Sequence, residues 1–438
     1  MRLMSVVTVQ LGQCGNQIGA EFFRTAYEEA SASHLTYETF FRAPEHDKGQ
    51  GQLVARAVLI DTEPKVIQAV TRGEGSGAHG WKYEPGNCLW QQSGSGNNWA
   101  RGYHQYGPQL HDQVCDVIHR EVEACDHLGG FVLMQSMAGG TGAGLGTRVA
   151  EVLREEFPST CIMSQCVWPY DSGEVIVQNY NTLLTLSHLL DATDGIILVP
   201  NEGLHATCAR LHNIKRPDFQ DLNRVAARAL ASVLLPAASG SGNQPGSGKC
   251  MSVSDVAEHM CAHPAHRVLG LRCVPQMPAG SVDFTVFTWA SILKRLRQML
   301  ITGSILEEGF NWGTSVPAPG ATPKTRIVKS IANVLVLRGK GSMGADTSGF
   351  QDPGLYPIWA VSPLKVASQT AQFGKYEKAA GLLSNCQTFM PATERMLSHA
   401  YGMYESRAYI HQYTQQGMVQ ADFEEAFAQV EDCLAHYR

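Results

Sequence analysis

The sequence predicts an α/β protein built on a parallel sheet. Across residues 1–200, short apolar runs alternate with segments of helical periodicity, which is typical of parallel strands joined by helices. Two of these apolar runs are followed directly by glycine-rich turns. The chain has 438 residues, of which 44% are hydrophobic and 17% charged, so it can bury a large core in two or three packed units.

The first unit along the chain is a strand, a glycine turn and a helix. Val6, Val7 and Val9 predict a buried strand, which ends at the glycine turn of residues 12–15. Apolar residues then recur at helical spacing through Ala26. We therefore expect the turn to lie at the carboxyl end of a strand.

The same pattern returns later in this half. Residues 130–135 predict a second buried strand, and the loop Ala-Gly-Gly-Thr-Gly-Ala-Gly follows it at 138–144, before another helix. A further apolar strand at 196–199 leads into a helical stretch that we expect to extend over 201–235.

The second half contains loops and a helical end. Two stretches rich in glycine, serine and proline, at 239–249 and 311–323, predict surface loops. From Pro391 the periodicity becomes helical. The last helix carries an apolar stripe of Phe423, Phe427, Val430, Leu434 and Tyr437.

Charge and cysteine usage exclude several classes of protein. The net charge is −6 and no long basic block occurs, so we expect neither a nucleic acid nor a membrane surface as a partner. Twelve cysteines are scattered without a Cys-x-x-Cys pair, which favours reduced thiols in the cytoplasm. No apolar run approaches the roughly 18 residues that a membrane-spanning helix needs, and no cleavable leader is recognisable.

The glycine turns have the chemistry of a phosphate-binding site. Successive glycines between a strand and a helix leave backbone N–H groups open to a ligand, and the helix N-terminus adds positive potential. A tight strand-to-helix crossover is the simpler alternative. The dinucleotide pattern Gly-x-Gly-x-x-Gly fails because Leu145 stands at its last glycine, and no Gly-x4-Gly-Lys-Ser/Thr loop occurs. Two such turns in one half nevertheless favour a nucleotide.

The sequence resembles the tubulin family in three motifs: Gly-Gln-Cys-Gly-Asn-Gln at 12–17, Ser-Gly-Asn-Asn-Trp-Ala at 95–100, and the loop at 138–144. The resemblance continues through Asn201-Glu202 to Tyr413-Thr414 and covers nearly the whole chain. Within the family, the delta type looks most similar at 168–170, 173–181, 287–290 and 409–414.

The resemblance implies a tubulin-like α/β fold of three units. These are a GTP-binding parallel-sheet domain at 1–200, a central helix with a smaller α/β intermediate domain at 201–386, and a C-terminal helical hairpin at 387–438.

The resemblance also implies how GTP or GDP and Mg²⁺ are held. The phosphates would contact a set of small and polar residues from both glycine turns: Gly12, Gln13, Cys14, Ser136, Gly139, Gly140, Thr141 and Gly142. Asn97 would face the terminal phosphate. Asp61 and Glu63 match the acidic pair near the magnesium, where two carboxylates suit a metal that keeps most of its waters; an ordinary solvated turn before Pro64 is the alternative.

For the nucleoside, the resemblance places Asn201 and Asn223 at the guanine edge, where amides can both donate and accept. Phe219 stands where wall tubulins stack a tyrosine on the base. Gln178 replaces an acidic residue near the ribose, and Glu174, four residues earlier, can substitute for it.

Tubulins hydrolyse GTP at a head-to-tail contact, where the next subunit supplies an acid. Counting back from His263-Pro264, the position of that acid holds Asp255, which implies hydrolysis in trans. The alternative is a structural role, because Asp255 and Glu258 have the spacing of a capping box at a helix start. Close to Asp255 in the sequence stand four side chains of types that bind metals, although their spacing matches no strict zinc signature: His259, Cys261, His263 and His266.

These observations favour a GTP-binding delta-type tubulin of centriole or basal-body microtubules, needed for their assembly and for cilia. Its expected partners are other tubulins, of the epsilon, alpha and beta types, and centriolar proteins. A non-polymerising, GTP-bound assembly factor is the alternative, favoured by Cys250 and Ser252 in place of the family's Asn and Asp, and by the end at Arg438 without an acidic tail. A dinucleotide-dependent enzyme is a third hypothesis, but it lacks its glycine fingerprint.

Overall fold

A twelve-stranded sheet organises the computed structural model, which describes residues 4–30, 34–44, 52–73, 80–173, 175–239, 249–317 and 327–438. The order across the sheet is β11-β10-β14-β13-β15-β12-β9-β8-β7-β1-β4-β6. The strands of this sheet are β1 (Ser5–Leu11), β4 (Ala57–Asp61), β6 (Cys88–Trp90), β7 (Leu128–Ser136), β8 (Ile162–Trp168), β9 (Gly195–Pro200), β10 (Ala238–Ser239), β11 (Lys249–Cys250), β12 (Val268–Val274), β13 (Ser330–Gly339), β14 (Leu364–Gln369) and β15 (Lys378–Cys386). A small second sheet contains β2 (Phe41–Arg42), β3 (Leu53–Ala55) and β5 (Trp81–Lys82).

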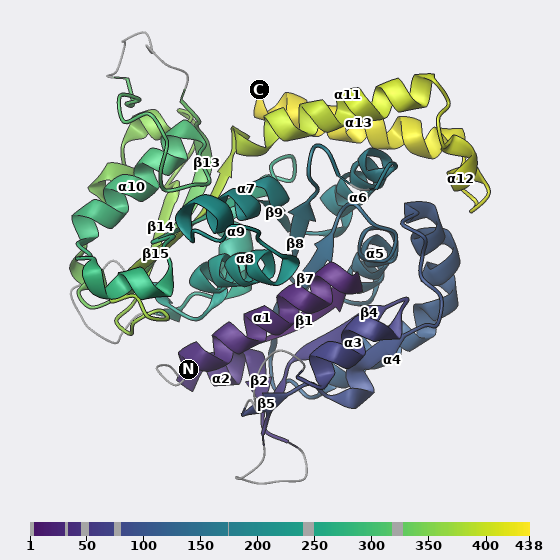
Figure 1. Cartoon of the computed structure of the whole chain (residues 1–438), viewed down its shortest axis with the longest axis horizontal. Coiled ribbons are helices and arrows are strands. Elements are labelled where there is room, and N and C mark those ends of the chain that lie inside the picture. The colour runs from purple at the N-terminus through teal and green to yellow at the C-terminus, as the bar shows by residue number, and fades with distance from the viewer. Residues whose placement is uncertain are drawn as a thin grey trace.

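Helices cover both faces of the large sheet (Figure 1). They are α1 (Gly12–Ala30), α2 (His34–Phe40), α3 (Pro64–Thr71), α4 (Gly107–Glu123), α5 (Gly146–Glu156), α6 (Gln178–Ala192), α7 (Asn201–Ala206), α8 (Phe219–Leu234), α9 (Val253–Met260), α10 (Trp289–Thr302), α11 (Met390–Glu405), α12 (Ile410–Thr414) and α13 (Gln420–Tyr437). Short π-helical turns occupy 101–106, 141–145 and 207–211. The α/β fold class predicted from the sequence is confirmed.

The strands from β6 to β12 run parallel throughout. Beyond β12 the sheet continues through the antiparallel partner β15. Both faces are apolar, as in other parallel sheets covered on two sides. On β1, for example, Val6 packs into the core beneath α1 and α8, whereas Val7 and Val9 pack into the core beneath α4, α5 and α6. The carboxyl ends of the parallel strands therefore meet at one edge.

One predicted element is wrong in its extent. The helical stretch expected over 201–235 is broken at 212–218, between α7 with its π-helical turn and α8. The break follows from a new helix start: the Asp218 side chain accepts a hydrogen bond from the backbone N–H of Asp221 at 2.9 Å, which completes a capping box. Phe219 is therefore the first residue of α8 instead of an interior helical residue.

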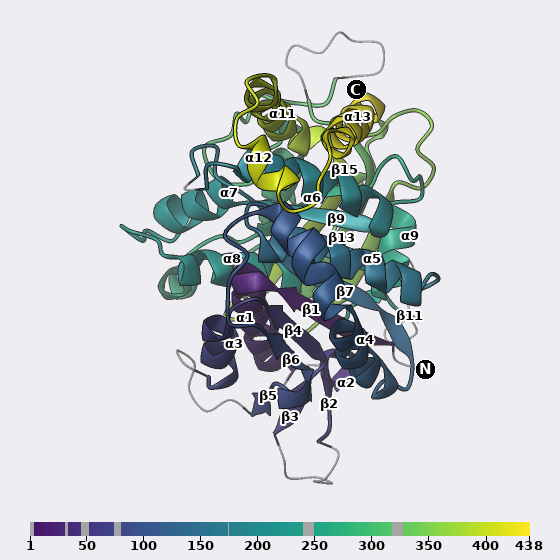
Figure 2. The same cartoon turned by 90° about the vertical axis from the view of Figure 1, so that its right-hand side faces the viewer.

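The C-terminal helices pack on the outer face of α6 (Figure 2). The predicted stripe on α13 is confirmed, since all five of its apolar residues are buried. Tyr401 of α11 stacks on Phe427 of α13, with ring centroids 4.0 Å apart. Among the described residues, no helix is long and apolar enough to cross a membrane.

The two predicted loops lie partly outside the described residues. Ser239 and Lys249 belong to the short paired strands β10 and β11, and residues 240–248 between them are outside the described ranges. Residues 311–317 form a turn without helix or strand, and 318–323 are again outside.

Candidate nucleotide site

A cavity of about 1580 Å³ opens where β1, β4, β7, β8 and β9 end. Ligands of open parallel sheets bind at this edge, and the cavity is larger than the roughly 300–1,000 Å³ of ordinary small-molecule pockets. Most of the predicted site residues line it: Gly12, Gln13, Cys14, Asp61, Glu63, Asn97, Ser136, Gly139, Gly140, Thr141, Gly142, Asn201, Phe219 and Asn223. The two predicted residues not among them are Asp255, which lies elsewhere, and Glu174, which is outside the described residues.

The two glycine turns pack backbone against backbone. Gly12 has a left-handed φ of 69°, and a Cβ there would lie 2.8 Å from the backbone N of Gly142. A Cβ on Gly140 would meet Asn98 O at 2.7 Å. At Gly139, by contrast, the nearest atom would be Asn97 Oδ1 at 3.9 Å, so this backbone faces open space. The glycines thus bring the loops close together and leave the cradle unobstructed for a phosphate chain.

Gly15 has a different role from the one its motif indicates. It is not among the residues that line the cavity. Its hydrogen-only side chain instead lets α1 lie directly against β7, because a Cβ there would be 1.9 Å from Met134 O. Burial raises the pKa of the neighbouring Cys14 thiol to about 12, so Cys14 is a neutral thiol at pH 7.

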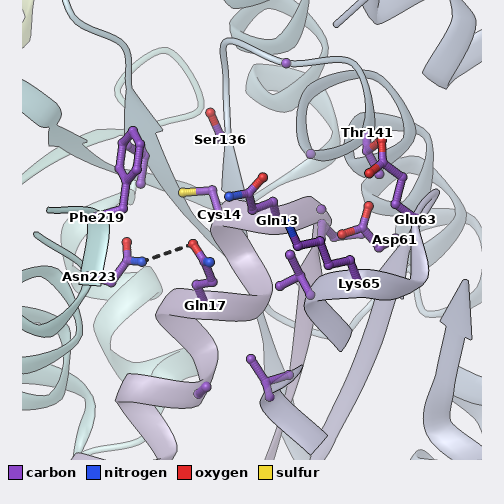
Figure 3. Close-up of a pocket in the computed structure, with 18 of the residues that line it drawn as sticks. Gln13, Cys14, Gln17, Asp61, Glu63, Lys65, Ser136, Thr141, Phe219 and Asn223 are labelled. Atoms are coloured by element: carbon purple, nitrogen blue, oxygen red, sulfur yellow. Dashed lines mark hydrogen bonds between the residues drawn. The ribbon is translucent and has the colours of Figure 1, made fainter. Parts of the chain in front are cut away.

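Acidic and hydroxyl groups gather at one end of the cavity. Figure 3 shows Asp61, Glu63 and Thr141 together there. The Thr141 hydroxyl is 2.6 Å from that of Thr62 and 2.9 Å from that of Ser95. Asp61 is buried, and its carboxylate accepts a hydrogen bond from the Thr62 N–H at 2.7 Å. This end joins the β4 strand end to the loop at 138–144.

Burial raises the pKa of Asp61 to about 6, and the nearby Glu63 carboxylate also raises it. A cation between the two groups would favour their ionised forms. Glu63 precedes α3 but makes no side-chain cap to that helix. No group of three or more His, Cys, Asp or Glu side chains is poised to hold a metal in the described parts of the chain. Two carboxylates at one end of the cavity have the chemistry to hold a hard cation such as Mg²⁺.

Amide and aromatic groups lie at the opposite end of the cavity (Figure 3). Asn201 begins α7, and Phe219, 59% exposed, begins α8. One turn further along α8, the Nδ2 of Asn223 lies 3.4 Å from Gln17 Oε1. Gln178 also lines the cavity, and its Nε2 donates to Tyr170 O at 2.7 Å. An exposed ring beside amides can stack on a base and hydrogen-bond its edge.

Asp255 lies near the amino ends of the parallel strands, at the opposite edge of the sheet from the cavity at their carboxyl ends. Ser254, beside it in α9, donates to Gly129 O at the beginning of β7, whereas Ser136 at the end of β7 lines the cavity. At about 3.3 Å per residue, these two ends of β7 are about 23 Å apart. Asp255 therefore cannot reach the cavity of its own chain.

The predicted capping box at Asp255 is shifted by one turn. Ser252 is the N-cap of α9, and its hydroxyl accepts from the Asp255 N–H at 3.1 Å. In return, Asp255 Oδ2 accepts from the Ser252 N–H at 2.9 Å. Asp255 therefore stands at position N3 of the box and not at the N-cap. Glu258 is not part of the box, because the N-cap is Ser252, three residues before Asp255.

The nearby histidines have separate partners. His259 Nε2 lies 3.1 Å from Asn333 O, and His266 Nε2 lies 3.1 Å from His436 O. These contacts hold the rings against neighbouring backbone. They do not form a metal cluster within the described ranges.

Asn181 of α6 is a polar residue at the site that sequence reasoning missed. It is fully buried, and its Nδ2 donates to Asn97 O at 2.8 Å and to Ala138 O at 2.7 Å. Both acceptors belong to loops that line the cavity. Its sequence context, one asparagine in a helical run, carries no signal for this contact, because its partners are 84 and 43 residues away.

The sequence is similar to known tubulins along its whole length. Residues 5–209 match the model of the Tubulin/FtsZ family GTPase domain. The chain is 42% identical to the tubulin delta chain of Canis lupus familiaris and 41% identical to that of Homo sapiens, in each case over 99% of both proteins. It is 27% identical to the tubulin beta chain of Aspergillus fumigatus, over 100% of this chain and 94% of that protein.

Proposed function

This chain belongs to the tubulin family, and we propose that it is a delta-type tubulin that binds magnesium–GTP in the cavity at the carboxyl ends of β1, β4 and β7. Family membership implies GTP binding and contact with other tubulins. The single observation that carries the proposal is the convergence on one cavity of predicted residues from six separate segments of the chain. We assign it to cytoplasmic microtubules of centrioles, basal bodies and cilia, with epsilon-, alpha- and beta-type tubulins and centriolar proteins as partners.

The proposed roles follow the two ends of the cavity. Asn201 and Asn223 bind the guanine edge while Phe219 stacks on the ring, with Glu174 toward the ribose. Gly12, Gln13, Cys14 and the loop at 138–142 hold the phosphates through backbone N–H groups and short polar side chains. Ser136 lies beneath the chain of phosphates and Asn97 faces its terminal group. Asp61 and Glu63 would hold Mg²⁺, which would neutralise phosphate charge.

Nucleotide analysis of gently purified protein tests this function. We expect about one guanine nucleotide per chain, released by EDTA because chelation removes the cation that Asp61 and Glu63 would hold. Asp61→Ala and Glu63→Ala are expected to weaken magnesium-dependent retention. Asp432→Ala, which removes an exposed carboxylate on α13, is the matched control and should retain nucleotide as the wild type does. Retention of NADH with no guanine nucleotide would refute the proposal.

Asp255 is proposed to act in trans, as the acid that a neighbouring subunit presents to this cavity. Its position at the opposite edge of the sheet supports this assignment. The alternative function, a non-polymerising GTP-bound assembly factor, is favoured by the engagement of the same carboxylate in the Ser252 capping box.

Single-turnover GTP cleavage in assembled protein separates these two roles. Asp255→Asn keeps an acceptor for the Ser252 N–H but cannot take up a proton at neutral pH. We expect it to lower the cleavage rate about a hundredfold, the typical contribution of a general acid–base group, with little change in the free energy of unfolding. An unchanged rate would leave Asp255 with the capping role alone and favour the assembly factor.

A further inference from the structure

The side-chain amide of Asn181 makes four hydrogen bonds, which is its full capacity. Besides the two bonds from Nδ2 to Asn97 O and Ala138 O, its Oδ1 accepts from the Trp99 N–H at 3.1 Å and from the Tyr413 hydroxyl at 2.6 Å. Turning the amide over would set oxygen against two carbonyls and N–H₂ against two donors. The four partners therefore fix both the position and the orientation of this group.

Two of the loops joined by Asn181 enclose the acidic end of the cavity. The first carries Asn97, whose backbone has a left-handed φ of 54°, and Ser95, whose hydroxyl is hydrogen-bonded to that of Thr141. The second runs from Met137 to Thr141, and Thr182 of α6 donates to Met137 O at 3.3 Å. Asn181 and the bond between Ser95 and Thr141 thus tie these two loops to each other.

The third group held by Asn181 comes from the C-terminal helices. Tyr413 of α12 is fully buried, and its ring packs edge-on against Tyr180 at 5.6 Å. A second contact reinforces the connection, since Asn98 Nδ2 donates to Gln412 O at 3.1 Å. The segment before α12 includes two non-glycine residues in left-handed conformation, Arg407 and Tyr409, so α12 is held against the loops in a constrained backbone.

We propose that Asn181 is a positioning residue that sets the two loops at the separation required by the terminal phosphate, and that Tyr413 couples this setting to α12. The inference rests on the proposed GTP site. Because coupling between two sites is reciprocal, a nucleotide that orders the two loops also orders α12. A partner that binds the α12 surface in turn alters the ratio of GTP affinity to GDP affinity at the cavity.

The ratio of GTP affinity to GDP affinity tests the positioning role. Asn181→Ala is expected to weaken GTP binding about tenfold more than GDP binding, which corresponds to about 1.4 kcal/mol of binding free energy. The loss is specific to GTP because only its terminal phosphate depends on the separation of the two loops. Tyr413→Phe, which keeps the ring and its packing, should shift the same ratio about threefold. Asn179→Ala, on the first turn of the same helix, is the matched control for the first variant.

Amide hydrogen exchange tests the coupling. In the wild type, GTP in place of GDP is expected to slow exchange in residues 410–414, and this difference should disappear in Tyr413→Phe. Tyr404→Phe, which removes a hydroxyl bonded to Glu424 in the same helical layer, should preserve it. If the wild type binds GTP but both variants keep its GTP-to-GDP ratio and its exchange pattern, the inference is wrong. If the wild type binds no GTP, the proposed function itself fails.

Discussion

Replacing Gly15 by alanine is expected to destabilise the protein by about 3 kcal/mol, at the upper end of the usual cost of overpacking, and to abolish nucleotide retention. In an exposed helix the same change stabilises by roughly 1 kcal/mol. Here the new Cβ would lie 1.9 Å from Met134 O and 2.8 Å from Met134 C. These are backbone atoms of a central strand that cannot move aside, so α1 must shift and carry Gln13 and Cys14 out of the cavity wall.

Urea unfolding and nucleotide analysis of the purified variant measure both effects. Gly402→Ala is the matched control, because Gly402 lies within α11 and nothing stands within 4 Å of a Cβ there. We expect that variant to be about 0.5–1 kcal/mol more stable than the wild type. Equal changes in the free energy of unfolding of the two variants would show that helix propensity, and not contact with β7, decides the effect.

Replacing Arg338 by methionine is expected to cost about 3–5 kcal/mol, because three buried carbonyls lose a charged donor and a buried acceptor left unsatisfied costs about 1–3 kcal/mol. Arg338 lies on β13, only 5% exposed, at the C-terminal end of α8. Its Nε donates to Ser232 O at 2.9 Å, Nη1 to Pro236 O at 3.4 Å, and Nη2 to Leu235 O. Burial lowers the pKa of Arg338 to about 10, so it is still charged at pH 7. The guanidinium thus donates to backbone carbonyls at the C-terminal end of α8, where no following helical turn supplies N–H donors.

Denaturant unfolding curves measure this loss. Arg297→Met is the matched control, since Arg297 donates to Gly349 O and Asp352 nearer the surface and should contribute less than about 1 kcal/mol. Arg338→Lys retains the charge with fewer donors in one plane, so its stability should fall between those of the wild type and Arg338→Met. A loss below about 1 kcal/mol for Arg338→Met would contradict the capping role.

Features that depend on local pattern could be predicted from the sequence. Alternation of apolar runs and helical periodicity predicts the parallel half of the sheet, because each strand and its crossover helix are close in the chain. The individual cavity residues came from the resemblance to the tubulin family. The strand pattern explains why several of them meet: Gly12, Ser136 and Asn201 stand directly at or after strand ends, and parallel strands bring those ends together.

Features that depend on distant partners could not be predicted. The sequence pattern predicts the wrong start for α9, because Ser252 and Asp255 both have the spacing of an N-cap with an acidic residue three positions later. Only the packing of the helix decides between the two. The pattern does not predict the break before α8, because the apolar residues of α7 and α8 together have the periodicity of one continuous helix. The roles of Asn181, Gly15 and Arg338 depend on contacts more than 40 residues away in sequence.

If Asp255 acts in trans as we propose, its separation from the cavity restricts the symmetry of an assembly that hydrolyses GTP. Asp255 and the cavity lie at opposite ends of β7, so a compact two-fold contact centred on either of them brings two cavities or two acids together. Only a heterologous, repeating contact brings Asp255 of one copy to the cavity of the next. A series of this kind that stays open has two chemically different termini, because one exposes the cavity and the other exposes Asp255. With GTP bound in the cavity as proposed, we expect nucleotide exchange at the first terminus.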